Sequence, residues 1–211
     1  MQQWDRQAME LGILPEILME NAAAAAFRQL SALCPRLAGK QVWLLMGSGN
    51  NGGDAACLAR YLLDAGACPH VFHTRPLEHY RNETAYHLRT ALTCGVPFLP
   101  VAALTETHLP HPDILVDGLL GTGFSGQLRD DARRLVSFVN ELSPRPLILS
   151  LDVPSGLDAT SGLPCPEAVK ADMTVSFAAA KPGLMLPWAR PYTGECHVGP
   201  IAMPAKVRKE G

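Results

Sequence analysis

Hydrophobic residues occur along this chain in short runs that are separated by longer stretches of mixed polarity. The clearest run covers residues 42–46, where five consecutive apolar residues are bounded by turn-forming residues. A run of this length is too short for a helix and is typical of a strand that is covered on both faces. Comparable runs predict six further strands, over residues 69–74, 97–101, 114–117, 146–153, 172–178 and 196–202.

Between these runs, apolar residues recur at helical spacing. The pattern predicts helices over residues 54–65, 77–94 and 130–142, and residues 5–32 are expected to form two helices divided by a turn that begins at Gly12. Strands that alternate with helices indicate an α/β fold, in which a mainly parallel, doubly wound sheet is built with right-handed crossovers. The whole chain, 1–211, is expected to form a single domain.

The run at 42–46 leads directly into a glycine-rich turn. Four of the next seven residues are glycines, which allow positive φ angles and a close approach of the backbone to a ligand. Asp54 is expected to cap the following helix, so the turn offers backbone N–H groups and the positive end of a helix dipole, as anion sites do. Asn50 and Asn51 add side-chain oxygens that can bind a cation or a nucleotide. The alternative is a tight connection without a ligand.

Two more polar turns follow later strands. One is glycine-rich and covers residues 117–127, and the other, 152–158, is rich in side-chain oxygens. In a parallel sheet every turn after a strand emerges at the same edge, and ligands of open α/β sheets bind there. We therefore expect these turns to converge with 47–54, which brings together four polar residues, Asn51, Asp117, Asp152 and Ser155.

Composition narrows the class of protein. Apolar residues make up 47% of the chain and charged residues 18%, with a formal net charge of −2, so we expect no nucleic-acid partner. The six cysteines form no C-x-x-C pair, which favours reduced thiols. The polar start and the lack of a long apolar stretch predict a cytoplasmic protein with no membrane contact. The tail at 205–211 is expected to be solvated, or the stub of a linker.

The histidines give little indication of a site. His70, His73 and His197 fall on predicted strands, and no histidine has a partner at metal-ligand spacing. We expect all of them to lie at the surface or at the edge of the core.

A dehydrogenase has to be considered, because the first turn contains the G-x-G-x-x-G pattern of dinucleotide-binding folds. That pattern is usually followed by an acidic residue at the end of the second strand, which binds the ribose. Here the second strand ends in His73, Thr74 and Arg75. Arg75 is able to bind the 2′-phosphate of NADP, so an NADP-dependent dehydrogenase is an alternative interpretation of this turn.

Five blocks of sequence, in order, resemble the YjeF N-terminal family. They are LMENA at 18–22, GNNGGD at 49–54, DGLLGTGFSG at 117–126, LDVPSGLD at 151–158 and KPG at 181–183. Enzymes of that family are NAD(P)H-hydrate epimerases, which interconvert the R and S forms of hydrated NAD(P)H, NADHX and NADPHX, and use K+. The resemblance implies a Rossmann-like three-layer α/β/α sandwich, in agreement with the predicted sheet.

The resemblance also implies a site. K+ would be bound by Asn51, Asp117 and Ser155, which suits a hard cation that prefers several oxygen ligands. One departure from the family pattern is Ala55, where a glycine is usual. The substrate contacts that the resemblance implies are Asn50, Asn51, Gly52, Gly53, Asp54, Gly121, Thr122, Gly123, Phe124, Ser125, Gly126, Gln127 and Asp152.

Epimerisation requires a bond at the hydrated ring carbon to break and to re-form on the other face. The ring nitrogen can expel the protonated hydroxyl to leave a planar iminium, and reversible ring opening is the alternative. Either route needs proton transfer, for which Asp152 is the candidate catalytic residue. Lys181 is a second candidate, with a plain surface turn as its alternative interpretation.

The family resemblance also bears on partners. It implies a homodimer, and the small residues at 22–26 would allow two N-terminal helices to approach closely, although such a run is also typical of simple core packing. Fusion to, or cooperation with, an ADP- or ATP-dependent NAD(P)H-hydrate dehydratase is a further implication. The rival class is a non-catalytic nucleotide-binding or scaffold module of the same fold.

Overall fold

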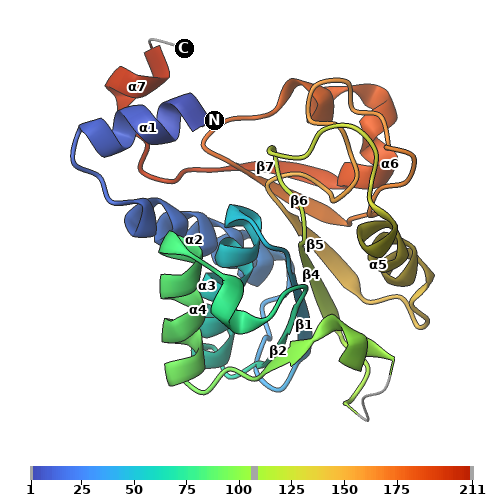
Figure 1. Ribbon diagram of the computed structural model, residues 1–211. Coiled ribbons are helices and arrows are strands. Elements are labelled where there is room, and N and C mark those ends of the chain that lie inside the picture. Colours follow the sequence, from blue (N-terminus) through green and yellow to red (C-terminus); the bar gives the residue numbers. More distant parts are fainter. Residues whose placement is uncertain (1, 106–108, 210–211) are drawn as a thin grey trace.

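The computed structural model describes residues 2–105 and 109–209, and its centre is a seven-stranded sheet (Figure 1). All neighbouring strands pair in parallel, in the order β3-β2-β1-β4-β5-β6-β7. This confirms the predicted parallel, doubly wound α/β fold, and each predicted strand is present within three residues of its expected ends. The strands are β1 (Gln41–Met46), β2 (Cys68–His73), β3 (Phe98–Pro100), β4 (Ile114–Gly118), β5 (Leu147–Leu151), β6 (Met173–Phe177) and β7 (Glu195–Gly199).

Helices cover both faces of the sheet and give the expected three layers. One face carries α2 (Pro15–Leu33), α3 (Asn50–Asp64) and α4 (Asn82–Thr93), and the other carries α5 (Asp130–Glu141) (Figure 1). Strand β1 shows why, because its alternate side chains enter two separate cores. Leu44 packs in the core with α2, α3 and α4, whereas Leu45 packs in the core that contains α5.

Three short helices lie outside the central layers. They are α1 (Gln2–Glu10), α6 (Arg190–Thr193) and α7 (Ala205–Lys209). Helices α1 and α7 lie side by side at the edge of the molecule (Figure 1), and Val207 of α7 is buried in the same core cluster as Ala8 of α1. Val207 is therefore anchored by its buried side chain, whereas Ala205 and Lys206 are exposed, and the solvated tail at 205–211 stays a prediction. Residues 210–211 lie outside the described part of the chain.

The start of α3 also differs from the prediction. The helix begins at Asn50 with Gly49 as its N-cap, so Asp54 lies inside the helix and does not cap it. Residues 50–53 form the first turn of this helix. Only glycine fits at Gly52, because a Cβ there would lie 2.0 Å from the carbonyl oxygen of Gly47. The glycines thus let the helix begin directly against the end of β1.

The predicted helix over 77–94 is divided in two. A short 3-10 helix, η1 (Leu77–His79), is separated from α4 by Tyr80 and Arg81, which have extended backbones. Tyr80 is buried, and its hydroxyl donates a hydrogen bond to the carbonyl oxygen of Met46 over 3.3 Å. This contact at the end of β1 explains why the chain does not continue as one helix.

The alanine-rich segment of α2 is part of the core. Ala22, Ala23, Ala25 and Ala26 are at most 3% exposed, and the Cβ of Ala25 lies close to Gly199 of β7. The packing interpretation of this run is therefore correct, and these alanines are not available for contact with a second chain. Across the part of the chain that the structure describes, no helix combines the length and the apolar character that crossing a membrane requires.

Candidate functional site

The strand order reverses between β1 and β4, and the loops that follow these strands meet there. The Gly47 N–H donates a 3.0 Å hydrogen bond to the Gly118 carbonyl oxygen. A Cβ on Gly47 would lie 1.8 Å from the carbonyl oxygen of Leu119, so only glycine allows this approach. Beside this junction lies a cavity of about 1210 Å³. Pockets for drug-sized ligands have volumes of roughly 300–1,000 Å³, so this cavity has room for a larger molecule such as a dinucleotide.

Most of the substrate contacts expected from the sequence line this cavity. The lining includes Asn50, Asn51, Asp54, Gly121, Thr122, Gly123, Phe124, Ser125, Gln127 and Asp152. Three expected residues do not line it, namely Gly52, Gly53 and Gly126. Gly53 instead packs against the helices, since a Cβ there would lie 2.6 Å from the Met19 side chain. A role for these three glycines in substrate binding stays a prediction.

The three residues expected to bind a cation come together next to the cavity: Asn51 lines it, whereas Asp117 and Ser155 are buried behind its lining. Asp117 is fully buried, and its Oδ1 accepts a 2.5 Å hydrogen bond from the Ser155 hydroxyl. The same hydroxyl accepts a 2.9 Å hydrogen bond from the Leu120 N–H. Asn51 donates its Nδ2 to the carbonyl oxygens of Leu120, over 2.6 Å, and Leu151, over 3.0 Å. The sheet register therefore juxtaposes an amide, a carboxylate and a hydroxyl, as predicted.

This arrangement has free capacity for a cation. With both hydrogens of Nδ2 committed, Asn51 Oδ1 is left buried without a hydrogen-bond partner. Burial raises the pKa of Asp117, while hydrogen bonds from Ser155, Ser150 and the Leu119 N–H oppose that shift. This orphaned amide oxygen belongs to a residue that Leu120 and Ser155 connect to the buried Asp117 carboxylate, and such oxygen donors fit K+ because hard cations take oxygen ligands.

Asp152 lies at the same wall, at the end of β5. Its backbone has a φ of +61°, which is unusual for a residue with a side chain and directs the carboxylate toward the cavity. Oδ2 accepts a 3.2 Å hydrogen bond from the Thr122 N–H, and Oδ1 accepts one from Lys181 Nζ. Lys181 is 6% exposed and also donates to the carbonyl oxygen of Phe177 over 2.8 Å. The surface-turn interpretation of Lys181 is therefore wrong.

A second carboxyl group of the cavity has a different environment. Asp54 is 7% exposed, and burial raises its pKa well above the ordinary value, with the charges of Asp152, Asp5 and Glu83 adding to the shift. Asp5 and Glu83 also line the cavity. Neither Asp5 nor Glu83 was predicted from the sequence. Glu83 follows β2 at a helix start, which is a usable signal, whereas Asp5 reaches the cavity only through the packing of α1.

Two arginines add positive charge to the lining. Arg75 follows β2, as the sequence analysis noted, and Arg129 is the N-cap of α5. Arg129 was not singled out from the sequence, although a basic residue between the second glycine turn and a helix start is a recognisable pattern. Guanidinium groups in such positions suit the phosphates of a dinucleotide.

Fold and site together define a doubly wound α/β protein with a polar, dinucleotide-sized cavity at its topological switch point. The family model described as YjeF-related protein N-terminus matches residues 15–183, and the chain belongs to this family.

Two relatives of similar length are both named NAD(P)H-hydrate epimerase. A protein of Pirellula staleyi named NAD(P)H-hydrate epimerase is 34% identical over 204 residues, which cover 94% of this chain and 88% of the relative. A Nitrosopumilus maritimus protein of the same name is 30% identical, with 97% and 94% covered. A crystal structure of the yeast protein ynu0 matches with a TM-score of 0.75 and 27% identity, over 85% of this chain and 78% of that one.

Other relatives are longer. A Pyrobaculum aerophilum protein named bifunctional NAD(P)H-hydrate repair enzyme Nnr is 38% identical over 96% of this chain. The present chain spans only 40% of that relative. The similarity therefore concerns one part of the bifunctional protein.

Proposed function

We propose that this chain epimerises the R and S forms of hydrated NADH and NADPH, as a K+-dependent step in the repair of damaged nicotinamide nucleotides. Its full-length relatives are named NAD(P)H-hydrate epimerase, so the chain is an isomerase by family. The observation that carries the proposal is the position of Asp152, a carboxylate fixed at the wall of a dinucleotide-sized cavity. This is the group that the reaction needs, because both epimers share one carbon that must exchange its hydroxyl between faces.

The chemistry follows from the groups on the wall. A proton passes to the ring hydroxyl, the C–O bond breaks as the ring nitrogen lone pair forms a C=N bond, and water leaves. Water then adds to the opposite face of the planar iminium and releases a proton. Asp54, whose raised pKa favours its protonated form, is suited to donate. Asp152, paired with Lys181, is suited to accept.

A cation in the adjoining subsite would be bound by Asn51 Oδ1, Asp117 and Ser155. When bound, K+ supplies positive charge that orients the polar groups of the substrate and of the loop at 118–122. The support is the orphaned Asn51 oxygen together with the buried Asp117 carboxylate, to which Asn51 is linked through Leu120 and Ser155. Ser155 fixes both the carboxylate and the Leu120 backbone, so the cation and substrate subsites share one framework.

The experiment starts from one purified epimer of NADHX or NADPHX and follows the other by chromatography. We expect the enzyme to exceed the enzyme-free rate, and to do so more strongly in KCl than in LiCl at equal ionic strength. A rate equal to the enzyme-free control would contradict the epimerase proposal, and equal rates in both salts would contradict K+ dependence alone. A dehydrogenase would instead oxidise ordinary NADPH with a carbonyl substrate, and a scaffold module would bind nucleotide without turnover.

The proposal extends to the oligomeric state, the partner enzyme and the cellular location of the protein. We propose a homodimer, supported by exposed apolar side chains at the junction of α1 and α2, where Leu11, Leu14 and Ile17 are 48–59% exposed. A monomer mass in light scattering at micromolar concentration would contradict it.

Bifunctional relatives support cooperation with a dehydratase that acts on the same hydrates. A cytoplasmic location is consistent with six free cysteines.

A further inference from the structure

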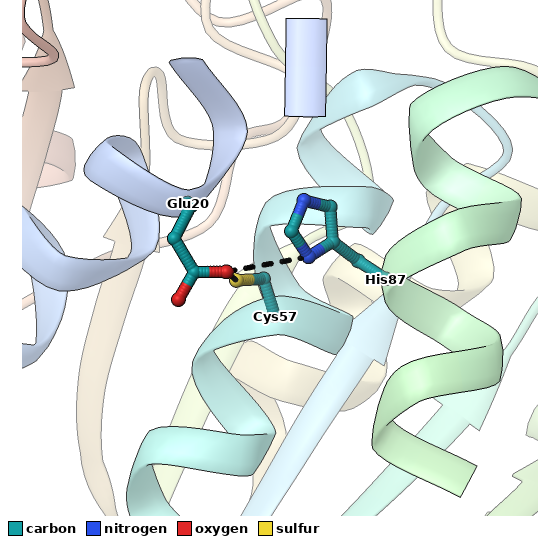
Figure 2. A group of neighbouring side chains, drawn as sticks. All are labelled: Glu20, Cys57 and His87. Carbon is teal, nitrogen blue, oxygen red and sulfur yellow. Dashed lines mark hydrogen bonds and ion pairs between the residues drawn. The ribbon is translucent and has the colours of Figure 1, made fainter. Parts of the chain in front are cut away.

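A second group of polar side chains lies in the helical layer, outside the cavity. Glu20 of α2, Cys57 of α3 and His87 of α4 point toward one another between the three helices (Figure 2). Cys57 and His87 are 0% and 1% exposed, and Glu20 is half-buried. The Cys57 Sγ lies 3.4 Å from Glu20 Oε2, and His87 Nδ1 lies 3.6 Å from the same oxygen.

The hydrogen bonding of His87 defines which of its nitrogens faces the group. Nε2 lies 3.1 Å from the carbonyl oxygen of Glu16, and a carbonyl oxygen can only accept, so Nε2 carries the proton. Burial lowers the pKa of His87, which keeps the ring neutral. Nδ1 is then an unprotonated nitrogen, buried and without a hydrogen-bond partner, whose lone pair points at a carboxylate oxygen. Two electron-rich atoms that face each other in a buried position repel, and a cation between them would remove this repulsion.

The carboxylate is itself oriented by its neighbours. Tyr61 donates a 2.6 Å hydrogen bond to Glu20 Oε1, and Arg60 contacts both carboxylate oxygens at 2.8 and 2.6 Å. Burial opposes ionisation of Glu20, but the hydrogen bonds from Tyr61, Arg60 and Cys57 outweigh it and lower its pKa. Supporting contacts of this kind, together with the backbone carbonyl behind His87, are those that commonly orient metal ligands.

We propose that Glu20, Cys57 and His87 form a three-ligand site for a transition-metal cation of the zinc class. A tetrahedral zinc site with ordinary bond lengths separates its N, O and S ligands by about 3.4–3.7 Å. The two separations given above match those edges, and all three ligand atoms lie within 4.8 Å of one another. One thiolate, one imidazole and one carboxylate favour Zn²⁺ over K+ or Mg²⁺, which take oxygen ligands.

Binding has a defined proton balance. Burial raises the pKa of the Cys57 thiol, so the free protein carries S–H at neutral pH. The metal binds thiolate, and one proton is released to solvent for each cation bound. Arg60 gives up its contacts with Glu20 Oε2 and with Cys57 Sγ, which lies 3.7 Å away, and keeps the one with Oε1. The fourth position of the cation is left for water, and the three helices become linked through one ion. This site does not depend on the proposed epimerase function.

The test uses the full chain, first treated with a chelator and then titrated with Co²⁺ and Zn²⁺. We expect one equivalent of Co²⁺ to give thiolate-to-cobalt charge-transfer absorption, and Zn²⁺ to displace it with release of one proton. Calorimetry in buffers of different ionisation enthalpy measures that proton. A Co²⁺ spectrum without a thiolate band in wild-type protein would overturn the proposal, and this measurement requires no variant to fold.

Variants locate the site. Cys57→Ala and His87→Gln are expected to weaken Zn²⁺ binding by more than about 100-fold, since loss of even a supporting partner costs about 10–100-fold. Cys94→Ala is the matched control, because it removes an exposed cysteine that is not part of the three-residue cluster and should leave the affinity unchanged. Retained affinity in both cluster variants, or loss in the Cys94 control, would show that Zn²⁺ binds elsewhere and would overturn the assignment.

Discussion

Two buried polar clusters, built in different ways, share helix α3. At the sheet edge, Asp117 and Asp152 lie in or directly after strands and accept hydrogen bonds from the backbone N–H groups of Ser155 and Thr122. Between the helices, Glu20, Cys57 and His87 come from three different helices and meet where those helices pack together (Figure 2). The difference teaches that strand register positions the first cluster, whereas the second depends on how three helices pack. Each prediction below perturbs one side of this comparison.

The largest effect on stability is expected at Lys181. Lys181→Met removes the partner of Asp152 and leaves a largely buried carboxylate without its cation. Breaking a buried ion pair in this way destabilises a protein by about 3–5 kcal/mol. Denaturant unfolding checks this, with the exposed Lys170→Met as control. Equal loss in both variants would contradict a special role for the pair.

A somewhat smaller loss is expected at Asp117. Asp117→Asn keeps the shape, but an NH₂ group in place of Oδ2 would face two donors, the Ser150 hydroxyl and the Ser155 N–H. The Ser150 hydroxyl can rotate to accept from the new amide, so one hydrogen bond to the charged group is lost, which costs about 1.5–3 kcal/mol. We expect both destabilisation and loss of the K+ response of epimerisation. A variant that keeps full activity and full K+ response would remove the cation subsite from the account.

The contrast between the clusters explains what the sequence could predict. Turns after parallel strands converge by topology, so the convergence of Asn51, Asp117, Asp152 and Ser155 followed from the order of apolar runs alone. Asp5 could not be placed in that way, because its position depends on how α1 packs. The same holds for His87, which no local spacing relates to Glu20 or Cys57. The expectation that every histidine lies at the surface or at the edge of the core is wrong for His87, which is 1% exposed. The start of α3 was misplaced because glycines usually end helices, whereas here close packing at Gly52 requires them.

The pH dependence of stability should differ in sign between the clusters. The pKa of Asp54 is raised in the folded protein, so its contribution is fully present below about pH 3.8 and is lost as pH rises through the folded pKa. Asp54→Asn removes a carboxyl group whose ionisation burial opposes, and it should raise the melting temperature at neutral pH relative to wild type. The exposed Asp64→Asn is the control. A lower melting temperature for Asp54→Asn at pH 7 would contradict the assigned burial effect.

The smallest effect is expected at His87, and in the opposite direction. Its pKa is lowered in the folded protein, so its contribution is present above pH 6.5 and is lost as pH falls toward the folded pKa. Metal-free His87→Gln should therefore lose less stability than wild type between neutral and mildly acidic pH. Thermal melts with a chelator present measure this. An unchanged pH profile in the variant would show that His87 does not titrate as its burial implies.

The central claim is that Asp152 transfers a proton during epimerisation, and one comparison tests it most directly. Asp152→Asn preserves size but removes proton exchange, and general acid–base groups contribute roughly 10²–10⁴-fold to rates. The assay follows conversion of one purified hydrate epimer in KCl, with Asp64→Asn and enzyme-free samples alongside. The account predicts that Asp152→Asn still binds substrate but loses activity toward the enzyme-free rate, while Asp64→Asn matches wild type. Full activity in Asp152→Asn would contradict it.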